Sequence, residues 1–481
     1  MCPRGIPLLG NALQLPTVKP WHTLAKWKKS YGSIVYLNMA GQPMVILNTK
    51  KTVEDLLDQR TSKYSARPHF IVANIMTGGF NFVLMSGGER WRKMRRASDN
   101  ALGLKHTVNY HSIQRNEAVF MAHSLLGDPN NWRSHVERTS SSVALSLMYD
   151  SPLIQSLQDP SLLWMNSYIE KISATLMPGA FLVEHLPRSL SKWRRDAEKS
   201  FEENNVYFGK KFQNIKKQVK IKEIANCLIR SVPGLQDFST LLVQKLSVKS
   251  TFSLWQGVPA HIILDLDGNY DDMTRAQEEL DKVIGRSRLP SFADLKHLPY
   301  IHAIVKEVLR WRTPLPIGVP HVSTEDDYYD GYYIPKGTLC LANVWSLNHD
   351  LEIYGPDAEE FRPERHLDEN GQLKDGLLGL SEGHFTYGFG QRICVGRRVA
   401  NNTLFMAAAT TLWTMRLEGV KDSDGNVVVP DVSAEEENGV LVRPPPFSIT
   451  TTPRFQDADT FIKEARDEVV EENLARLDAR G

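Results

Sequence analysis

The sequence has no long hydrophobic run. No stretch of it approaches the ~20 consecutive apolar residues that a membrane-spanning helix needs. Its first residues, MCPRGIPLLGNALQLP, lack the charged leader and apolar core of a secretory signal. The chain as written is therefore predicted to be soluble, or peripheral to a membrane.

Net charge and cysteine are also scarce. The 57 basic and 56 acidic residues leave a net charge of +1, so no overall field favours nucleic acid or an acidic partner. The four cysteines are Cys2, Cys227, Cys340 and Cys394, with no short-spaced pair among them. This usage argues against a disulfide framework or a zinc site and is typical of a reducing compartment.

Internal repeats and low-complexity linkers are absent as well, which favours one large domain over several. We expect this domain to span residues 1–454. The remaining residues, 455–481, are highly charged with sparse apolar positions, and they predict an exposed helical tail.

Helical patterns dominate the body of the chain. Two β-rich stretches with turn residues, 31–48 and 330–345, predict hairpins. Apolar residues spaced three and four apart predict helices over 50–60, 89–104, 109–127, 134–149, 161–176, 190–222, 272–285, 299–313 and 395–417. The fold class is therefore mainly α with a small β region.

One cysteine lies in an unusual setting, the stretch FTYGFGQRICVG at 385–396. Gly388 and Gly390 allow positive φ or the close approach of a flat ligand. A long helical pattern follows Cys394 at once, so free N–H groups and the helix dipole are expected to favour a thiolate there. The alternative is a small buried residue beside an ordinary turn.

The spacing G-x-R-x-C-x-G, which begins at Gly390 and follows Phe389, resembles the haem-binding loop of the cytochrome P450 family. Tyr387 stands where that family usually has phenylalanine. The resemblance implies a P450 fold and a haem b cofactor whose iron takes Cys394 as its axial ligand.

Two further segments match a structural triad of that family. Glu307 and Arg310, in KEVLRW, share one helix face, and FRPER supplies Arg365 ahead of the cysteine loop. An isolated E-x-x-R is very weak evidence for a buried pair, because many helices carry one as a solvated pair. The resemblance implies that the three residues brace the cysteine-bearing side of the haem without taking part in chemistry.

Other residues resemble the family's haem-carboxylate donors. Trp91 and Arg95 lie four apart in ERWRKMRR, which by itself would be an amphipathic basic helix. His321 and Arg392 add possible donors, since charge-assisted bonds to carboxylates favour arginine. With Phe389 and Gly390 these residues form the expected cofactor site.

The resemblance implies a monooxygenase that inserts one atom of O₂ into an organic substrate. Electrons would come from NADPH-cytochrome P450 reductase at the cytosolic face of the endoplasmic reticulum. Phrases such as LPYIHAIVKEVLRW resemble fungal members of secondary metabolism. The mainly apolar stretches 68–85, 314–319 and 439–441 would contact a hydrophobic small molecule.

A local basic surface is expected where the reductase would dock, although the chain is nearly neutral overall. The residues expected to form it are Lys93, Arg96, Arg397 and Arg398.

Two features depart from the family. Members normally begin with a hydrophobic anchor, whereas this sequence opens in the Pro/Gly hinge that follows it. Residues 246–275 lack the acid–alcohol motif of the distal helix, and Thr251, Asp265 and Asp267 are only weak substitutes for its proton relay. We therefore expect an incomplete distal helix and weak or uncoupled oxygenase activity.

Two alternatives stay open. One is a haem-thiolate protein without efficient O₂ activation, either an isomerase, a peroxide-type enzyme or an inactive variant. The other is a helical scaffold that never binds haem.

Overall fold

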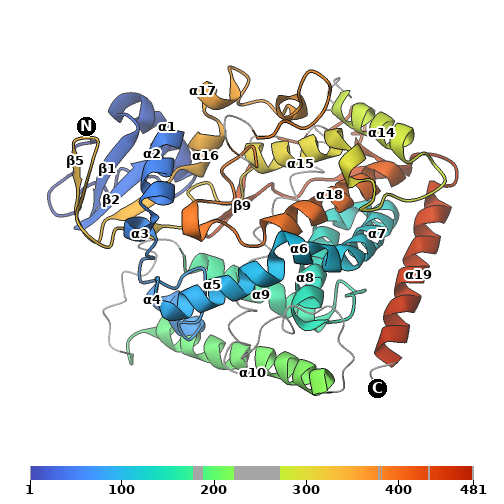
Figure 1. Cartoon of the computed structure of the whole chain (residues 1–481), viewed down its shortest axis with the longest axis horizontal. Coiled ribbons are helices and arrows are strands. Elements are labelled where there is room, and N and C mark those ends of the chain that lie inside the picture. Colours follow the sequence, from blue (N-terminus) through green and yellow to red (C-terminus); the bar gives the residue numbers. More distant parts are fainter. Residues whose placement is uncertain are drawn as a thin grey trace.

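The computed structural model describes residues 2–176, 188–220, 271–376, 380, 382–428, 430–431 and 434–478. Helices make up most of this body, and the four-stranded sheet that contains residues 34–47 lies beside the N-terminal end of the chain (Figure 1). The predicted fold class, mainly α with a small β region, is confirmed.

Each predicted helix is present, with ends that differ by a few residues. The helices are α1 (Pro20–Tyr31), α2 (Lys50–Val53), the π-helix η1 (Glu54–Gln59), α3 (Thr61–Tyr64), α4 (Ile71–Met76), α5 (Glu89–Leu102), α6 (Leu104–Thr107), α7 (His111–Gly127), α8 (Trp132–Tyr149), α9 (Pro160–Ala174), α10 (Lys192–Lys220), α14 (Asp271–Val283), α15 (Pro299–Trp311), α16 (Val344–Asn348), α17 (Leu351–Tyr354), α18 (Arg397–Thr414) and α19 (Ala458–Asp478). Short 3-10 turns are η2 (Val108–Tyr110), η3 (Pro129–Asn131), η8 (Leu295–His297), η9 (Pro363–His366) and η10 (Gly390–Arg392).

The strands confirm one predicted hairpin and correct the other. They are β1 (Ile34–Met39), β2 (Gln42–Leu47), β3 (His321–Val322), β4 (Asp327–Tyr329), β5 (Tyr332–Ile334), β6 (Leu339–Ala342), β7 (Met415–Gly419), β8 (Glu436–Asn438), β9 (Leu441–Arg443) and β10 (Ile449–Pro453). β1 and β2 pair as the expected hairpin, but β5 pairs with β4 and not with β6. The apolar strand β6 is buried and pairs with β2 and β3, so tertiary burial overrides the local turn at 335–337.

The main core forms around α18, whose residues from Val399 to Thr414 are mostly buried. α7, α14, α15 and α19 pack against it. Such burial stabilises the fold by roughly 25 cal/mol for each Å² of apolar surface removed from water. It also fixes the N-terminal end of α18, where the cysteine loop is attached.

The C-terminal segment is a helix, as predicted, but it is not simply exposed. α19 buries one face formed by Ala458, Ile462, Ala465 and Val469, and it packs against α7 and α18. Arg476 also pairs with Asp150. The apolar positions recur at four, three and four residues, which places them on one helix face despite the charge of the segment.

None of the helices in the described part of the chain is both long enough and apolar enough to cross a membrane.

Candidate functional site

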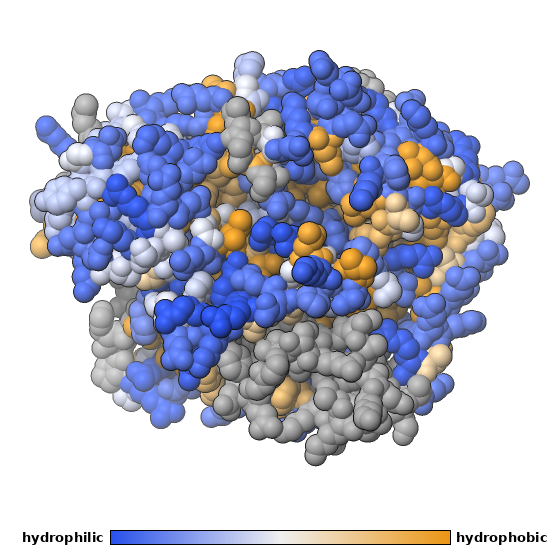
Figure 2. Space-filling view, in the orientation of Figure 1, coloured by the Kyte–Doolittle hydropathy of each residue, from blue (hydrophilic) through white to orange (hydrophobic). Residues whose placement is uncertain are grey.

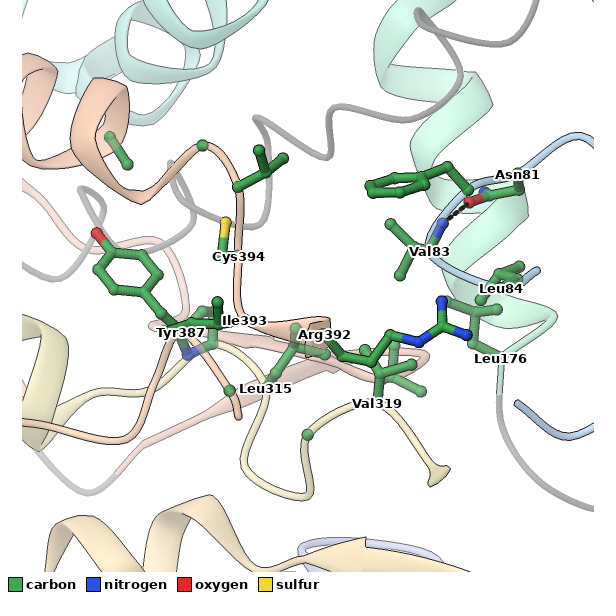
Figure 3. A pocket seen from close by; sticks show the side chains of 18 of the residues that line it. Asn81, Val83, Leu84, Leu176, Leu315, Val319, Tyr387, Arg392, Ile393 and Cys394 are labelled. Atoms are coloured by element: carbon green, nitrogen blue, oxygen red, sulfur yellow. Dashed lines mark hydrogen bonds between the residues drawn. The ribbon is translucent and has the colours of Figure 1, made fainter. Parts of the chain in front are cut away.

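A cavity lies between the cysteine loop, α5, α9 and three connecting segments (Figure 3). Each of the three stretches predicted to contact substrate contributes to its wall. The contributing residues are Asn81, Phe82, Val83 and Leu84, then Pro314, Leu315, Gly318 and Val319, and finally Val440 and Leu441. Most of this wall is apolar, which suits a hydrophobic ligand.

Cys394 lies on this wall, just before α18 begins at Arg397. Its backbone N–H donates to the Tyr387 carbonyl at 2.8 Å, and its carbonyl accepts from Nη1 of Arg397 at 3.1 Å. Burial raises the pKa of the Cys394 thiol, while the N–H of Gly396 and the charges of Arg95 and Arg397 act in the opposite direction. The expected thiolate is therefore not favoured by the loop alone; a bound metal cation would supply the missing stabilisation.

Two glycines shape the loop. Gly390 has φ of 51°, and a Cβ there would lie 2.3 Å from the carbonyl oxygen of Leu57 in η1. Gly388, with φ of 77°, faces open space, so a Cβ there would meet no atom within 4 Å. Gly390 thus lets the loop pack against η1, and Gly388 leaves the cavity wall open to a flat group.

Arg392 carries the most informative polar atoms of the site. Its Nε donates to the carbonyl of Ser65 at 2.8 Å, but both terminal nitrogens are buried without a hydrogen-bond partner. The guanidinium lies 4.2 Å from the ring of Trp91, whose indole nitrogen is also unpartnered. Burial and the charge of Arg95 lower the pKa of Arg392 to about 10.

The other predicted donors surround Arg392. Arg95 donates to the carbonyl of Ile393 at 2.6 Å and also pairs with Asp99. Nδ1–H of His321 donates to the Tyr64 carbonyl, 2.7 Å away, and burial holds the pKa of His321 well below the usual range. The structure therefore brings both residues to the same side of the cavity, with His321 as a neutral imidazole.

Arg67 is a further cation that sequence reasoning missed. It is buried, lines the cavity and, among the described residues, donates to the carbonyls of Val83, Val319 and Pro320. Burial and the charge of Arg392 lower its pKa well below the ordinary value. The signal in the sequence was an arginine within the largely apolar run SARPHFIV.

The described wall of the cavity contains three arginines and no aspartate or glutamate. Buried cations are costly unless paired, and two buried guanidinium nitrogens still need acceptors. The chemistry of this wall fits a ligand that brings its own negative charges. A haem does so through two carboxylates, and its iron would take the sulfur of Cys394.

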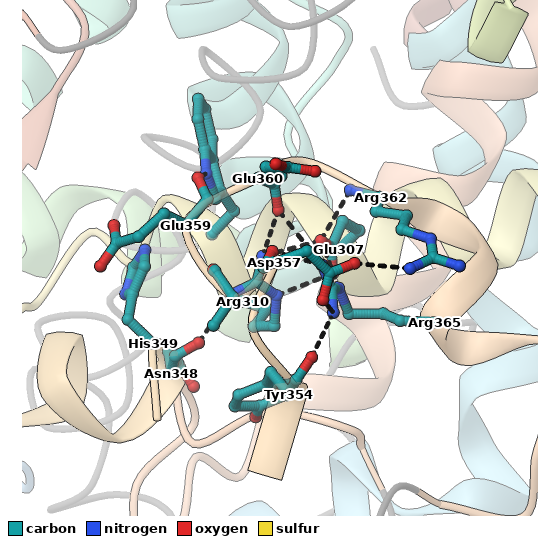
Figure 4. A network of polar contacts seen from close by, with 12 residues as sticks. Glu307, Arg310, Asn348, His349, Tyr354, Asp357, Glu359, Glu360, Arg362 and Arg365 are labelled. Carbon is teal, nitrogen blue, oxygen red and sulfur yellow. Dashed lines mark hydrogen bonds and ion pairs between the residues drawn. The ribbon is translucent and has the colours of Figure 1, made fainter. Parts of the chain in front are cut away.

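Glu307 stands at the centre of a buried ion-pair network (Figure 4). Its carboxylate accepts from Nε and Nη2 of Arg310, both at 2.8 Å, and from Nε of Arg365 at 2.9 Å. Burial alone would raise the pKa of Glu307, but Arg310 and His366 outweigh burial and hold it well below the usual range. Glu307 and Arg310 are fully buried, so the solvated-pair interpretation is wrong.

Asn348 connects this network to the cysteine loop. Its carbonyl accepts from Arg310 at 2.7 Å, its amide oxygen accepts from the N–H of Phe385 at 2.8 Å, and its amide nitrogen donates to Thr386 at 3.0 Å. Sequence reasoning missed this residue, because nothing in its local pattern places it against a loop far along the chain. The triad thus supports the segment that leads to Cys394.

The weak proton-relay candidates Thr251, Asp265 and Asp267 lie outside the described residues, as does most of the segment 246–275. Their roles stay predictions.

The family model described as Cytochrome P450 matches residues 1–251 and 261–451. The short break falls inside the segment that lacks the distal motif.

Curated relatives are similar along nearly the whole chain. A cytochrome P450 monooxygenase of Armillaria gallica is 44% identical over 97% of this chain and 92% of its own length. Cytochrome P450 monooxygenase 58 of Postia placenta is 37% identical over 96% of this chain and 90% of its own length. A zebra fish cytochrome P450 solved with progesterone has the same fold, with a TM-score of 0.74 and 22% identity over 91% of this chain and all of that one. The chain belongs to the cytochrome P450 family of haem-dependent monooxygenases.

Proposed function

We propose that this protein is a haem-thiolate monooxygenase that hydroxylates or epoxidises a hydrophobic small molecule. The observation that carries the proposal is the meeting, in one apolar cavity, of Cys394 and buried guanidinium nitrogens that have no acceptor. Fungal relatives named as cytochrome P450 monooxygenases over nearly the whole chain support this chemistry. The role that we propose for it is fungal secondary metabolism.

The haem site is assembled from residues of four segments. Cys394 would hold the iron, while Arg392, Trp91 and Arg67 would donate to the haem carboxylates. His321 and Arg95 bond to the surrounding backbone, Arg95 adds positive charge, and Phe389 packs at the base of the loop. When bound, the haem supplies the redox chemistry with O₂, and the protein orients the substrate and excludes water.

The reduced, carbon monoxide-bound absorption spectrum tests this proposal, because it reports haem, thiolate ligand and open distal site together. A thiolate-type spectrum with product formed in proportion to NADPH supports the monooxygenase. The same spectrum, with NADPH oxidised but its electrons released as hydrogen peroxide and not used to form product, would select the alternative without efficient O₂ activation. The missing distal motif predicts this second result. A colourless protein expressed with ample haem would refute both.

Arg392→Met is expected to have opposite effects on the two forms of the protein. In the haem-free form it removes a buried charge without an acid partner, so the denaturation midpoint should rise. In the haem-bound form it removes a donor to a carboxylate, worth about 1.5–3 kcal/mol. Haem loss to apomyoglobin should therefore become about ten- to hundredfold faster.

Arg454→Met is the matched control, because Arg454 is also buried but pairs with Asp281 outside the cavity. It should destabilise both forms and leave haem loss unchanged. An Arg392→Met protein that retains haem as wild type does would contradict the role of Arg392.

For the partner, we propose NADPH-cytochrome P450 reductase, docking on the basic patch formed by Lys93, Arg96, Arg397 and Arg398 at the endoplasmic reticulum surface. Strongly hydrophilic side chains gather over α5 on the face shown in Figure 2. Lys93 pairs with Glu89 and Arg397 with Glu382. Within the described part of the chain, Arg96 and Arg398 form no ion pair. Their positive charges are therefore less neutralised than those of Lys93 and Arg397.

Haem reduction by the reductase should slow as ionic strength rises, because salt screens exposed charges over ~8 Å at physiological strength. Arg96→Gln combined with Arg398→Gln should slow it at low salt and flatten the salt dependence, whereas Lys29→Gln on α1 should not. Stopped-flow absorbance measures the rate. If the rate of haem reduction in the wild type did not change with ionic strength, this docking surface would be excluded.

A further inference from the structure

Tyr387 departs from the phenylalanine usual at its position, and its extra hydroxyl has a specific partner. The side chain is only 7% exposed and lines the cavity on the same wall as Cys394 (Figure 3). A buried hydroxyl without a partner would be costly. Here the Tyr387 hydroxyl donates to Oδ1 of Asn401, on α18, at 2.5 Å.

The contacts continue from Asn401 back to the cysteine. Nδ2 of Asn401 donates to Oε2 of Glu382 at 2.9 Å. Oε1 of Glu382 pairs with Nε of Arg397 at 3.4 Å, and Nη1 of Arg397 donates to the carbonyl of Cys394 at 3.1 Å. The N–H of Cys394 in turn donates to the carbonyl of Tyr387 at 2.8 Å. The five residues therefore form a closed ring of polar contacts.

This ring holds both backbone polar groups of Cys394. Its N–H donates to the carbonyl of Tyr387, and its carbonyl accepts from the side chain of Arg397. A phenylalanine at 387 would keep the backbone bond but would leave Oδ1 of Asn401 without the donor that orients its amide. The amide would then be free to release Glu382, and Glu382 to release Arg397.

We propose that Tyr387, Asn401, Glu382 and Arg397 are positioning residues that hold Cys394 in the orientation needed to bind iron. The proposal rests on the proposed function, since it gives Cys394 that role. The effect of the Tyr387 hydroxyl is transmitted through the side chains of the ring, because hydrogen bonds in a chain orient and strengthen one another.

The test uses the haem-bound protein and requires no turnover. The carbon monoxide complex of the reduced protein is followed as its thiolate-type spectrum converts to the thiol type in a fixed, mild urea concentration. Tyr387→Phe should speed this conversion about fivefold, the effect of one hydrogen bond of about 1 kcal/mol. Glu382→Gln should speed it as well, because it weakens the pair with Arg397 while leaving Tyr387 in place.

A double-mutant cycle shows whether the hydroxyl acts through Asn401. Asn401→Leu should speed conversion, and adding Tyr387→Phe to it should give no further acceleration, because the link is already broken. Independent multiplication of the two rate increases would overturn the proposal. Wild-type conversion in both Tyr387→Phe and Glu382→Gln would also overturn it.

Tyr110→Phe is the control for a purely structural loss. The Tyr110 hydroxyl is buried and donates to the carbonyl of Ala101, on α5, at 3.0 Å, so this bond is not part of the ring around Cys394. This variant should lower overall stability without changing the conversion rate. If Tyr110→Phe sped the conversion as much as Tyr387→Phe does, the effect of Tyr387→Phe would be explained by general destabilisation of the fold. Failure of the proposed function would be seen separately, as a wild-type protein that shows no thiolate-type spectrum.

Discussion

Cys394→Ala is expected to abolish the thiolate-type spectrum of the reconstituted protein and to leave its helical fold in place. Cys394 supplies the only thiol on the described wall of the cavity, and a thiolate-type spectrum requires a thiolate as the iron ligand. The loop is held by other means, since the N–H and carbonyl of residue 394 bond to Tyr387 and Arg397. Absorbance of the reduced carbon monoxide complex and far-ultraviolet circular dichroism measure the two expectations.

Cys340→Ala is the matched control. Cys340 is fully buried in β6, and burial raises the pKa of its thiol far above the ordinary value. Its replacement should cost some stability, because a small cavity forms in the sheet, but the thiolate-type spectrum should stay. If the Cys394→Ala protein kept that spectrum, the ligand assignment would be wrong.

Glu307→Gln is expected to destabilise the protein by about 3–5 kcal/mol, the usual cost of removing one partner from a buried ion pair. Arg310 is fully buried and would lose its acid partner, and the nearly buried Arg365 would be left with its longer pair to Asp357. Such a loss is a large part of the 5–15 kcal/mol that holds a typical domain folded. We expect little folded protein at growth temperature and a much lower urea midpoint in what can be purified.

Glu89→Gln provides the comparison, because Glu89 makes an exposed pair with Lys93 on α5. Exposed pairs contribute about 0–1 kcal/mol, so this variant should unfold close to the wild type. Similar midpoints for the two variants would show that the buried network does not hold the fold.

The same carboxylate makes stability depend on pH. The folded-state pKa of Glu307 lies well below its value in the unfolded chain, which is about 4.3. Its contribution is therefore fully present above about pH 4.3 and is lost as the pH falls toward the folded-state pKa. Glu307→Gln should remove this component from the acid limb of the stability curve.

Residues close in the sequence carried most of what could be predicted. The spacing of Gly390, Arg392 and Cys394 predicted the loop that we propose as the iron-binding loop, and the i, i+3 spacing of Glu307 and Arg310 placed them on one helix face. Helical periodicity located the long helices within a few residues of their ends. These features follow from local geometry, which the order of side chains sets directly.

Contacts between distant segments could not be predicted in this way. The buried pair of Glu117 and Arg138 joins α7 to α8, and Asn348 joins the triad to the cysteine loop. Arg67 became a candidate ligand-binding residue only when its burial on the cavity wall, and its bonding to backbone carbonyls, were visible.

The sequence by itself determined the helical body, the loop that carries Cys394 and the membership that this loop implied. Tertiary structure alone decided that β6 leaves its expected hairpin, that α19 docks on α7, and that Tyr387 reaches Asn401. The physical reason is that burial and polar pairing are settled between surfaces that meet only after folding. The contacts of a charged helix or of an extra hydroxyl depend on residues that are distant in the sequence and become neighbours only in the folded protein.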